Sequence, residues 1–311
     1  MVQKNCIDKT ALVVCGPTGS GKTKLSIDLA KAFDGEIISA DSVAIYKGLN
    51  IGSAKPTEKE RSEVVHHMID VVSPTEEFSV AEYKELSRKI LSDVIKRGKT
   101  PVICGGTGYY IDALLYDFSY GNCPKNEKFR LKCEKIIEEQ GVLSLHERLR
   151  SVDKETADIL HPNDVMRIVR ALEIYETTGK KKSEITDKKT PVVSFFAFSY
   201  DYERKVLYER IEKRVDKMFA DGLIDEVNGL LDSGVTADMQ SMQAIGYKEV
   251  VSGLNEKLSE EQIKETVKRN TRRYAKRQIT WFKKTDNLVF LSPYIDAVSF
   301  IKEYLNGQKP N

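Results

Sequence analysis

Short apolar runs alternate with longer segments of helical periodicity through much of the chain. The apolar runs predict buried strands at 11–15, 36–40, 101–104, 192–198 and 288–291, and a further strand or extended segment at 68–72. The periodic segments predict helices at 24–33, 80–97, 202–231 and 260–284. Strands that alternate with helices are typical of a parallel sheet flanked by helices, so we expect an α/β fold. Ligands bind such sheets at the carboxyl ends of the strands.

The segment 122–191 has a different pattern of residue types from the rest of the chain. It holds long charged amphipathic stretches, few β-branched runs, and helix stops at Gly141 and Gly179. We therefore predict an all-helical domain at 122–191, inserted into a core formed by residues 1–121 and 192–311.

Composition narrows the class of protein. Hydrophobic residues make up 41% and charged residues 31% of the 311 residues, which is ordinary for a globular protein. Apolar residues recur at regular spacing almost to the C-terminus, which excludes disorder as the main state. The longest apolar run near the start, Ala11–Cys15, is far shorter than the roughly 20 residues of a membrane span, so we expect no membrane partner. From the cysteine usage we expect a cytoplasmic protein. The five cysteines contain no CxxC pair, which indicates neither a zinc site nor a disulfide framework. His66 and His67 lack a third ligand at metal-binding spacing and are predicted to be structural.

The most specific motif directly follows the first predicted strand and opens a predicted helix. It matches GxxxxGK[ST] in full and consists of Gly16, Pro17, Thr18, Gly19, Ser20, Gly21, Lys22 and Thr23. Glycines let backbone N–H groups turn toward an anion, Lys22 neutralises phosphate oxygens, and Thr23 can hold Mg²⁺. The motif predicts a P-loop NTPase-like core with a phosphate cradle.

Most P-loop proteins are nucleotide-binding enzymes that use ATP. Such enzymes usually carry an aspartate after a later strand, where it helps to hold Mg²⁺. The matching strand here ends in Val102–Gly106 without a carboxylate. The cradle therefore suits any diphosphate, and a P-loop small-molecule or nucleotide kinase is the alternative.

Asp41 stands at the end of the second predicted strand, on the cradle side of the sheet. A carboxylate there could bind Mg²⁺ or act as general base toward an acceptor. Its structural alternative is to cap the following loop together with Ser42. That loop, residues 45–56, is polar and punctuated by glycine, as binding loops often are.

Several further motifs give the chain a family resemblance. They are Asp41-Ser42 and the segments 45–48, 51–56, 105–107, 161–164, 170–173, 245–247 and 276–281, together with Arg167. With the P-loop they resemble the bacterial tRNA dimethylallyltransferases over about residues 11–284. The resemblance implies transfer of a dimethylallyl group from dimethylallyl diphosphate to N6 of the adenosine 3′-adjacent to the anticodon. It further implies Mg²⁺ as cofactor, the tRNA anticodon stem-loop as partner, and a channel between core and inserted domain. We expect the protein to act as a monomer.

The resemblance also implies roles for individual residues. Matched by position, Asp41 is the base, Thr107 lines the channel, and Lys22, Thr23 and Arg214 hold the diphosphate. Arg210 lies at i, i+4 from Arg214 on one helical face and is a further candidate for the diphosphate. From the residues alone, a solvated face paired with nearby glutamates is the alternative for both arginines.

A basic helix is the first candidate surface for tRNA. Eight basic residues and no acidic residue occur from Thr266 to Lys284. Among them Arg272, Arg273, Lys276 and Arg277 are predicted to contact the phosphate backbone. Ile263, Val267, Tyr274 and Trp281 mark a separate stripe that we expect to be buried. A solvated face balanced by carboxylates elsewhere is the alternative.

Three other segments are assigned to tRNA. The first consists of Met166, Arg167, Ile168, Val169 and Arg170, whose arginines could grip phosphates or pair with Glu173. The second consists of Met242, Gln243, Ala244, Ile245, Gly246 and Tyr247, which supply an amide and an aromatic ring suited to an unstacked base. The third consists of Asp41, Ser42, Val43 and Ala44.

Two further functions compete with the tRNA prenyltransferase. A prenyltransferase acting on free adenine nucleotides could dispense with the basic helix. A non-catalytic RNA-binding protein with a relic cradle would not need Lys22, Thr23 and Asp41, all of which are present.

Overall fold

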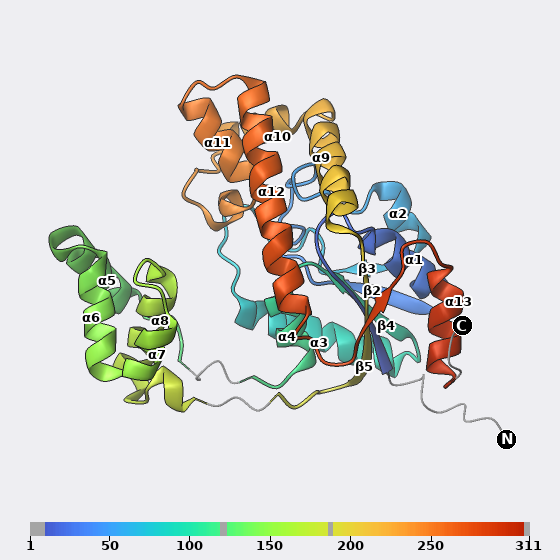
Figure 1. Ribbon diagram of the computed structural model, residues 1–311, viewed down its shortest axis with the longest axis horizontal. Helices are drawn as coiled ribbons and strands as arrows, with labels where there is room; N and C mark the ends of the chain where they lie inside the picture. The colour runs from blue at the N-terminus through green and yellow to red at the C-terminus, as the bar shows by residue number, and fades with distance from the viewer. Residues whose placement is uncertain (1–9, 119–122, 186–188, 308–311) are drawn as a thin grey trace. The chain divides into compact units, whose positions relative to one another are not determined.

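The structure, a computed structural model, describes residues 10–118, 123–185 and 189–307. It forms two compact units, of which one covers Tyr116–Thr190 and the other the chain before and after that segment. The sequence placed its insertion at 122–191. Figure 1 shows the course of the chain. No helix among the described residues is long and apolar enough to cross a membrane.

A six-stranded parallel sheet forms the centre of the first unit, in the order β3-β2-β4-β1-β5-β6. The strands are β1 (Thr10–Cys15), β2 (Gly35–Ser39), β3 (His66–His67), β4 (Thr100–Gly105), β5 (Ser194–Tyr200) and β6 (Leu288–Leu291). All six residues of β1 are buried, as expected of a central parallel strand with both faces covered. The predicted α/β fold with a helix-flanked parallel sheet is confirmed.

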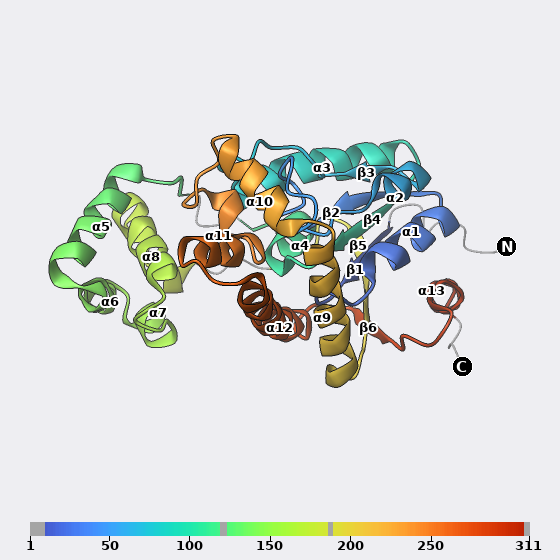
Figure 2. The same cartoon turned by 90° about the horizontal axis from the view of Figure 1, so that it is seen from above.

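Helices cover both faces of this sheet. The helices of this unit are α1 (Lys22–Ala32), α2 (Glu58–Glu63), α3 (Val80–Lys96), α4 (Gly108–Leu115), α9 (Arg204–Ala220), α10 (Leu223–Asp232), α11 (Tyr247–Asn255), α12 (Glu260–Phe282) and α13 (Ala297–Leu305), with the 3₁₀ helix η3 (Gln240–Gln243). On one face, Leu25 of α1 and Ile301 of α13 share a core with Leu12 and Val14 of β1. Helices α3 and α4 pack on the other face, and Figure 2 shows α3 and α13 on opposite sides of the sheet.

Two predicted elements differ in the structure. The segment 68–72 is not a strand, because Met68 and Asp70 have left-handed backbone angles (φ 61 and 55) that end the extended chain after β3. Val72 makes only an isolated bridge with Tyr46. The single helix predicted at 202–231 is two helices, because Gly222 (φ 94) turns the chain between α9 and α10.

Helices α9 and α12 lie against each other and extend away from the sheet (Figure 1). Arg272 of α12 donates to Glu212 of α9 at 2.6 Å, and Lys268 pairs with Asp216 one turn further along at 2.7 Å. These ion pairs fix the register of the two helices, and both helices contribute side chains to the site below.

The second unit is helical. Its helices are α5 (Glu127–Gln140), α6 (Val142–Val152), α7 (Lys154–Ile159) and α8 (Val165–Thr178), with the 3₁₀ helix η2 (Lys182–Glu184). Glu173 of α8 is fully buried and pairs with Arg130 at 2.8 Å and with Arg170 at 2.6 Å, while it accepts the N–H of Asn126. Because an unpaired buried carboxylate is costly, these contacts tie α8 to the start of α5.

Candidate active site

The carboxyl ends of β1, β2 and β4 open into a cavity of about 380 Å³ in the first unit. Its wall is built from segments far apart in the sequence. Among the residues that line it are Thr18, Lys22, Thr23, Asp41, Ser42, Val43, Ala44, Arg214, Gln243, Ala244, Ile245, Gly246, Arg277 and Gln278. The structure therefore brings the predicted base, the phosphate cradle and Arg214 to one place.

The P-loop curves around the start of α1. Its backbone is left-handed at Gly16, Gly19 and Gly21 (φ 133, 79 and 89), a conformation that only glycine adopts readily. Across the loop, Lys22 Nζ donates to the carbonyl of Pro17 at 2.8 Å. Burial, with a smaller contribution from Arg214, lowers the pKa of Lys22 to about 8. An anion in the cradle would favour the charged form of this amine.

Arg214 of α9 supplies a second half-buried cation. One Nη donates to the carbonyl of Ser53 at 3.4 Å, and Nε is buried without a hydrogen-bond partner among the described residues. Burial lowers the pKa of Arg214, and the nearby Asp41 opposes that shift. A buried guanidinium with an unused donor is costly unless an anion meets it. Lys22 and Arg214 therefore suit an anion at this end of the cavity, and their role in diphosphate binding stays a prediction.

Arg210 does not line this cavity. Its Nε donates to the carbonyl of Gly19 at 2.8 Å, and its guanidinium lies 4.8 Å from the ring centroid of Tyr202. Through this hydrogen bond Arg210 supports the P-loop. Direct contact between Arg210 and the diphosphate stays a prediction.

Asp41 is held by the backbone that follows it. Its Oδ1 accepts the N–H groups of Val43 at 2.9 Å and Ala44 at 3.2 Å, which is the loop-capping role left open by the sequence. Its Oδ2 has no hydrogen bond to the part of the chain that the structure describes, and the residue faces the cavity. One oxygen thus fixes the side chain while the other can accept a proton.

Thr107 stands beside Asp41 without lining the cavity itself. Its Oγ1 accepts the N–H of Ser42 at 3.2 Å, and the two hydroxyl oxygens are also 3.2 Å apart. Its own N–H donates to the carbonyl of Ala40 at 3.2 Å. Thr107 therefore fixes the loop after β2 against the turn after β4, and a role at the channel wall stays a prediction.

Gln278 of α12 is a site residue that the sequence analysis did not assign. Its Oε1 accepts the N–H of Thr18 in the P-loop at 2.9 Å, and its Nε2 donates to the carbonyl of Gly106 at 2.8 Å. The side chain is buried and bridges the cradle and the turn after β4. The sequence could have indicated this residue, because Gln278 is a polar residue on the otherwise apolar buried face of α12, between Ala275 and Phe282.

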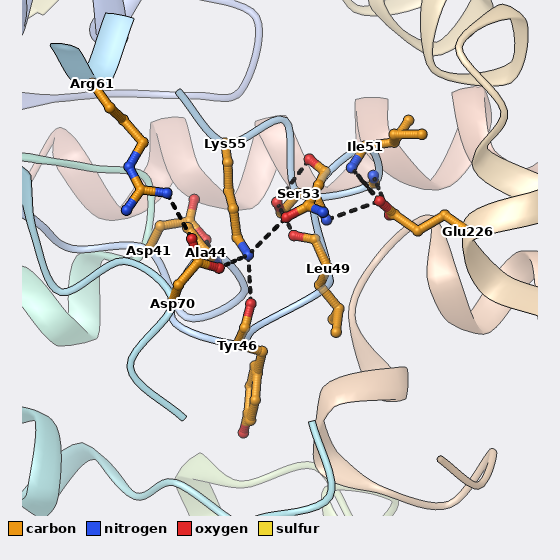
Figure 3. A network of polar contacts seen from close by, with 12 residues as sticks. Asp41, Ala44, Tyr46, Leu49, Ile51, Ser53, Lys55, Arg61, Asp70 and Glu226 are labelled. Carbon is orange, nitrogen blue, oxygen red and sulfur yellow. Dashed lines mark hydrogen bonds and ion pairs between the residues drawn. The ribbon is translucent and has the colours of Figure 1, made fainter. Parts of the chain in front are cut away.

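The loop after Asp41 forms another side of the cavity and is held by charged residues (Figure 3). Lys55 Nζ donates to Asp70 Oδ1 and to the carbonyl of Tyr46, both at 2.5 Å. Arg61 donates to the other oxygen of Asp70 at 2.7 Å. The Lys55 side chain is almost fully buried, so this ion pair fixes the loop rather than offering a free charge.

Glu226 of α10 clamps the same loop from the opposite end of the sequence. Its carboxylate accepts the N–H groups of Asn50, Ile51 and Gly52 at 2.8 to 3.2 Å. It also accepts the hydroxyl of Tyr247 at 2.6 Å. No local pattern predicts this contact, because the partners are about 175 residues apart along the chain.

The segment 242–247 corrects one prediction. Gln243, Ala244, Ile245 and Gly246 line the cavity. Met242 and Tyr247 are fully buried, and the Tyr247 hydroxyl is used by Glu226. The expectation that Tyr247 stacks on an unstacked base is therefore wrong for this structure, as is a side-chain contact from Met242.

The basic residues of α12 fall into two groups. Arg272 is held by Glu212 of α9, so its charge is already balanced, as the alternative interpretation held. Arg273, Lys276 and Arg277 are exposed, and no ion pair with a described residue involves them. Trp281 is 40% exposed, which overturns its predicted place in the buried stripe.

The residues of α8 that were predicted to contact tRNA also fall into two groups, exposed residues and residues that are buried or paired within the helical unit. Met166 and Arg167 are exposed, with Arg167 3.3 Å from Asp164. Ile168 lies in the core of the helical unit, with Val169 packed beside it, so neither offers its side chain freely to a partner. Arg170 pairs with Glu173 and donates to the carbonyl of Cys123 at 2.7 Å, which is the structural role that the sequence left open.

The part of the chain that the structure describes offers no ready-made acidic, cysteine or histidine cluster for a metal ion. Among residues 10–118, 123–185 and 189–307, no three His, Cys, Asp or Glu side chains are placed to share an ion. Cys15, Cys104, Cys123 and Cys133 are free thiols. Thr23 faces the cavity, and no hydrogen bond within the described ranges uses its hydroxyl.

Comparison with known sequences gives consistent matches. The sequence pattern of the IPP transferase family matches residues 44–285. The chain is 44% identical over 307 residues to a tRNA dimethylallyltransferase of Caldanaerobacter subterraneus subsp. tengcongensis, which covers 96% of this chain and 98% of that protein. It is 46% identical over 274 residues to a tRNA dimethylallyltransferase of Bacillus pumilus, which covers 88% and 86% of the two chains.

Solved structures match over similar lengths. The full-length tRNA isopentenylpyrophosphate transferase of Bacillus halodurans superposes with a TM-score of 0.72 at 39% identity, covering 96% of both chains. A eukaryotic dimethylallyltransferase acting on tRNA superposes with a TM-score of 0.79 at 29% identity, covering 96% of this chain and 80% of the other.

Proposed function

The chain belongs to the IPP transferase family, and from that membership we propose that it transfers a dimethylallyl group from dimethylallyl diphosphate to N6 of the adenosine immediately 3′ of a tRNA anticodon. The names of its relatives favour a tRNA prenyltransferase over a P-loop kinase. The exposed basic residues Arg273, Lys276 and Arg277 further favour an RNA acceptor over a free nucleotide.

One observation carries the proposal. Asp41 has one carboxylate oxygen that makes no hydrogen bond to the described residues, and it lines the same cavity as two half-buried cations, Lys22 and Arg214. A proton acceptor and an anion site in one enclosure are what transfer from a diphosphate to an amine requires.

Asp41 serves the nucleophile. The amino nitrogen N6 attacks C1 of the dimethylallyl group and sheds a proton as the new C–N bond forms. Oδ2 of Asp41 takes that proton, while Oδ1 stays bound to the N–H groups of Val43 and Ala44. A positioned general base of this kind contributes typically about 10²–10⁴-fold.

The cradle serves the leaving group. As the C1–O bond breaks, negative charge grows on the diphosphate. Lys22 and Arg214 both line the cavity, and this supports a role for the two cations in stabilising that charge. Arg210 supports the cradle by donating to the carbonyl of Gly19.

The residues present fit a bound Mg²⁺. This ion takes one or two protein oxygens and fills its remaining positions with waters and phosphate oxygens. The Thr23 hydroxyl, open to the cavity, would be its protein ligand. When bound, Mg²⁺ supplies further charge neutralisation to the leaving diphosphate.

The assay that tests this function supplies the protein with unmodified tRNA, Mg²⁺ and dimethylallyl diphosphate labelled in the prenyl group. We expect label in the tRNA, and none when ATP replaces the prenyl donor. Phosphate released or transferred from ATP, without a prenyl adduct from the other donor, would instead assign the cradle to a kinase.

A further inference from the structure

One end of the cavity is apolar, and the mechanism above does not use it. Beside the P-loop the lining is polar, as at Lys22 and Gln278. Further along α9 and α12, apolar side chains from three elements enter the lining: Met218 of α9, Val267 of α12 and Ile245 of the segment before α11. We call these three residues the apolar end of the cavity. Val267 is buried, while Met218 and Ile245 are half-buried.

The register of α9 and α12, which lie side by side in Figure 1, places Met218 and Val267 at the same level. The two ion pairs between these helices advance along α9 and go back along α12, so the helices are antiparallel. In one pair, Lys268 of α12 meets Asp216 of α9 at 2.7 Å. Met218 follows Asp216 by two residues and Val267 precedes Lys268 by one, so the two apolar side chains lie across from each other.

Two hydrogen bonds of Glu249 bring Ile245 to the same level. One carboxylate oxygen accepts the N–H of Gly246 at 2.7 Å, and the other accepts the side-chain amide of Asn270 at 2.9 Å. Asn270 lies three residues from Val267, within one turn of α12. Segments that are distant in the sequence therefore gather their apolar side chains at one place.

The cavity ends at this level on both helices. Met218 is the last residue of α9 that lines it, and one turn, about 6 Å along the helix axis, separates Met218 from Arg214. Val267 is the first residue of α12 that lines it, because Ile263 one turn earlier is buried beside Gly253. Both helices contact the P-loop at their opposite ends, so the apolar end is the part of their lining furthest from the cradle.

We propose that Met218 limits the transferred group to one isoprenoid unit, an inference that rests on the proposed function. The donor carries a charged diphosphate and an apolar tail. With the diphosphate held by Lys22 and Arg214, the tail extends to the apolar end, where burial of its methyl groups is favourable. A second isoprenoid unit would need the space that the Met218 side chain fills, and this overlap rejects the longer donor.

Geranyl diphosphate, which has one isoprenoid unit more, is the probe. With either donor N6 bonds to C1, the C1–O bond breaks, the diphosphate leaves, and the N6 proton passes to Asp41. We expect the wild type to transfer dimethylallyl and not geranyl groups to unmodified tRNA, as read from the mass of the modified nucleoside. Met218→Ala should raise the ratio of kcat/KM for geranyl over dimethylallyl diphosphate by at least about tenfold, since a few methylene groups decide this much in an apolar pocket.

Other variants separate tail length from general damage. Met218→Leu keeps a similar side-chain volume and should keep the wild-type selectivity. Lys217→Ala is the matched control on the same helix, because Lys217 is exposed, pairs with Asp221 and does not line the cavity. Ile245→Ala enlarges the same end and is the second test variant should Met218→Ala fail to fold.

Binding measurements test the apolar end without RNA. Inorganic diphosphate has no tail, so it should bind the wild type and Met218→Ala equally. Dimethylallyl diphosphate should lose affinity for Met218→Ala by on the order of tenfold, because its tail loses apolar contacts. Geranyl diphosphate should bind Met218→Ala more tightly than it binds the wild type.

The inference and the proposed function fail differently. Geranyl transfer by the wild type at the dimethylallyl rate, or unchanged exclusion of the geranyl group by folded Met218→Ala and Ile245→Ala, would overturn the role of Met218 while prenyl transfer stands. If no prenyl group is transferred from any donor, the proposed function fails, whereas the expected change in geranyl diphosphate affinity would still support the apolar end as the tail site. Weaker stem-loop RNA binding by Met218→Ala, with unchanged affinity for both prenyl diphosphates, would assign the apolar end to the acceptor base and overturn the inference.

Discussion

At the scale of single residues, the site depends on an aspartate with two oxygens in two roles. We predict that Asp41→Asn lowers the single-turnover rate of prenyl transfer by at least about 10², because the amide cannot take the proton. The substitution keeps an oxygen for the N–H groups of Val43 and Ala44, so the fold and the RNA affinity should be nearly unchanged.

The matched control is Asp232→Asn, at an exposed aspartate that ends α10. It should turn over at the wild-type rate. A wild-type rate in Asp41→Asn would remove Asp41 as the base.

Lys22 makes diphosphate binding depend on pH. Burial lowers its pKa to about 8, so the free cradle carries this charge below pH 8 and loses it as the pH rises. The anion binds the charged form, so affinity should be highest below pH 8 and fall above it by at most about tenfold per pH unit. The donor's own phosphate ionisation, with a pKa near 6, is complete in that range.

Calorimetric titration with dimethylallyl diphosphate from neutral to alkaline pH measures this dependence. Lys22→Arg is the control, because arginine stays charged throughout and should flatten the profile. If the affinity of the wild-type protein for dimethylallyl diphosphate does not fall above pH 8, the charge on Lys22 does not contribute to binding of the diphosphate.

At the scale of elements, α12 connects parts of the site that are distant in the sequence. Gln278 on its buried face bonds the P-loop and the turn after β4, Arg277 lines the cavity, and Trp281 rests on α4. Ion pairs from Arg272 to Glu212 and from Lys268 to Asp216 fix the helix against α9, which carries Arg214. The position of one helix thus determines the geometry of the cradle and its surroundings.

We predict that Gln278→Met weakens binding of dimethylallyl diphosphate by about tenfold. Methionine fills a similar volume but leaves the Thr18 N–H and the Gly106 carbonyl without partners, at a cost of about 1–3 kcal/mol each. Titration of the diphosphate measures the affinity, and thermal unfolding checks that the variant is folded. Gln140→Met, at an exposed glutamine that ends α5, should change neither quantity. Unchanged diphosphate affinity in a folded Gln278→Met protein would contradict the bridge.

At the scale of the whole molecule, the local sequence pattern was enough to predict the fold, the P-loop and Asp41. The apolar run of β1 and the glycines of the P-loop act through neighbouring residues, so their structure follows from adjacent sequence. Asp41 was also predictable, because strand ends share one edge of a parallel sheet.

Other features depend on contacts between segments that are distant in the sequence, and the sequence analysis either missed them or predicted them wrongly. Glu226 is separated by about 175 residues from the loop that it clamps, and Tyr247 is buried because it donates to that same carboxylate. Arg272 looks like a free cation in its own helix and is neutralised by Glu212 on another. Helical periodicity placed Trp281 in a buried stripe, yet the indole packs on Gly108 with its outer surface open.

The central claim is that this cavity attaches a dimethylallyl group to one nitrogen of one tRNA adenosine. The most direct measurement is mass spectrometry of nuclease fragments and nucleosides from tRNA incubated with the protein, Mg²⁺ and dimethylallyl diphosphate. The account predicts a single prenyl addition, on N6 of the adenosine immediately 3′ of the anticodon. A prenyl group on another nucleotide, on free adenine nucleotides only, or on no nucleoside at all would contradict it.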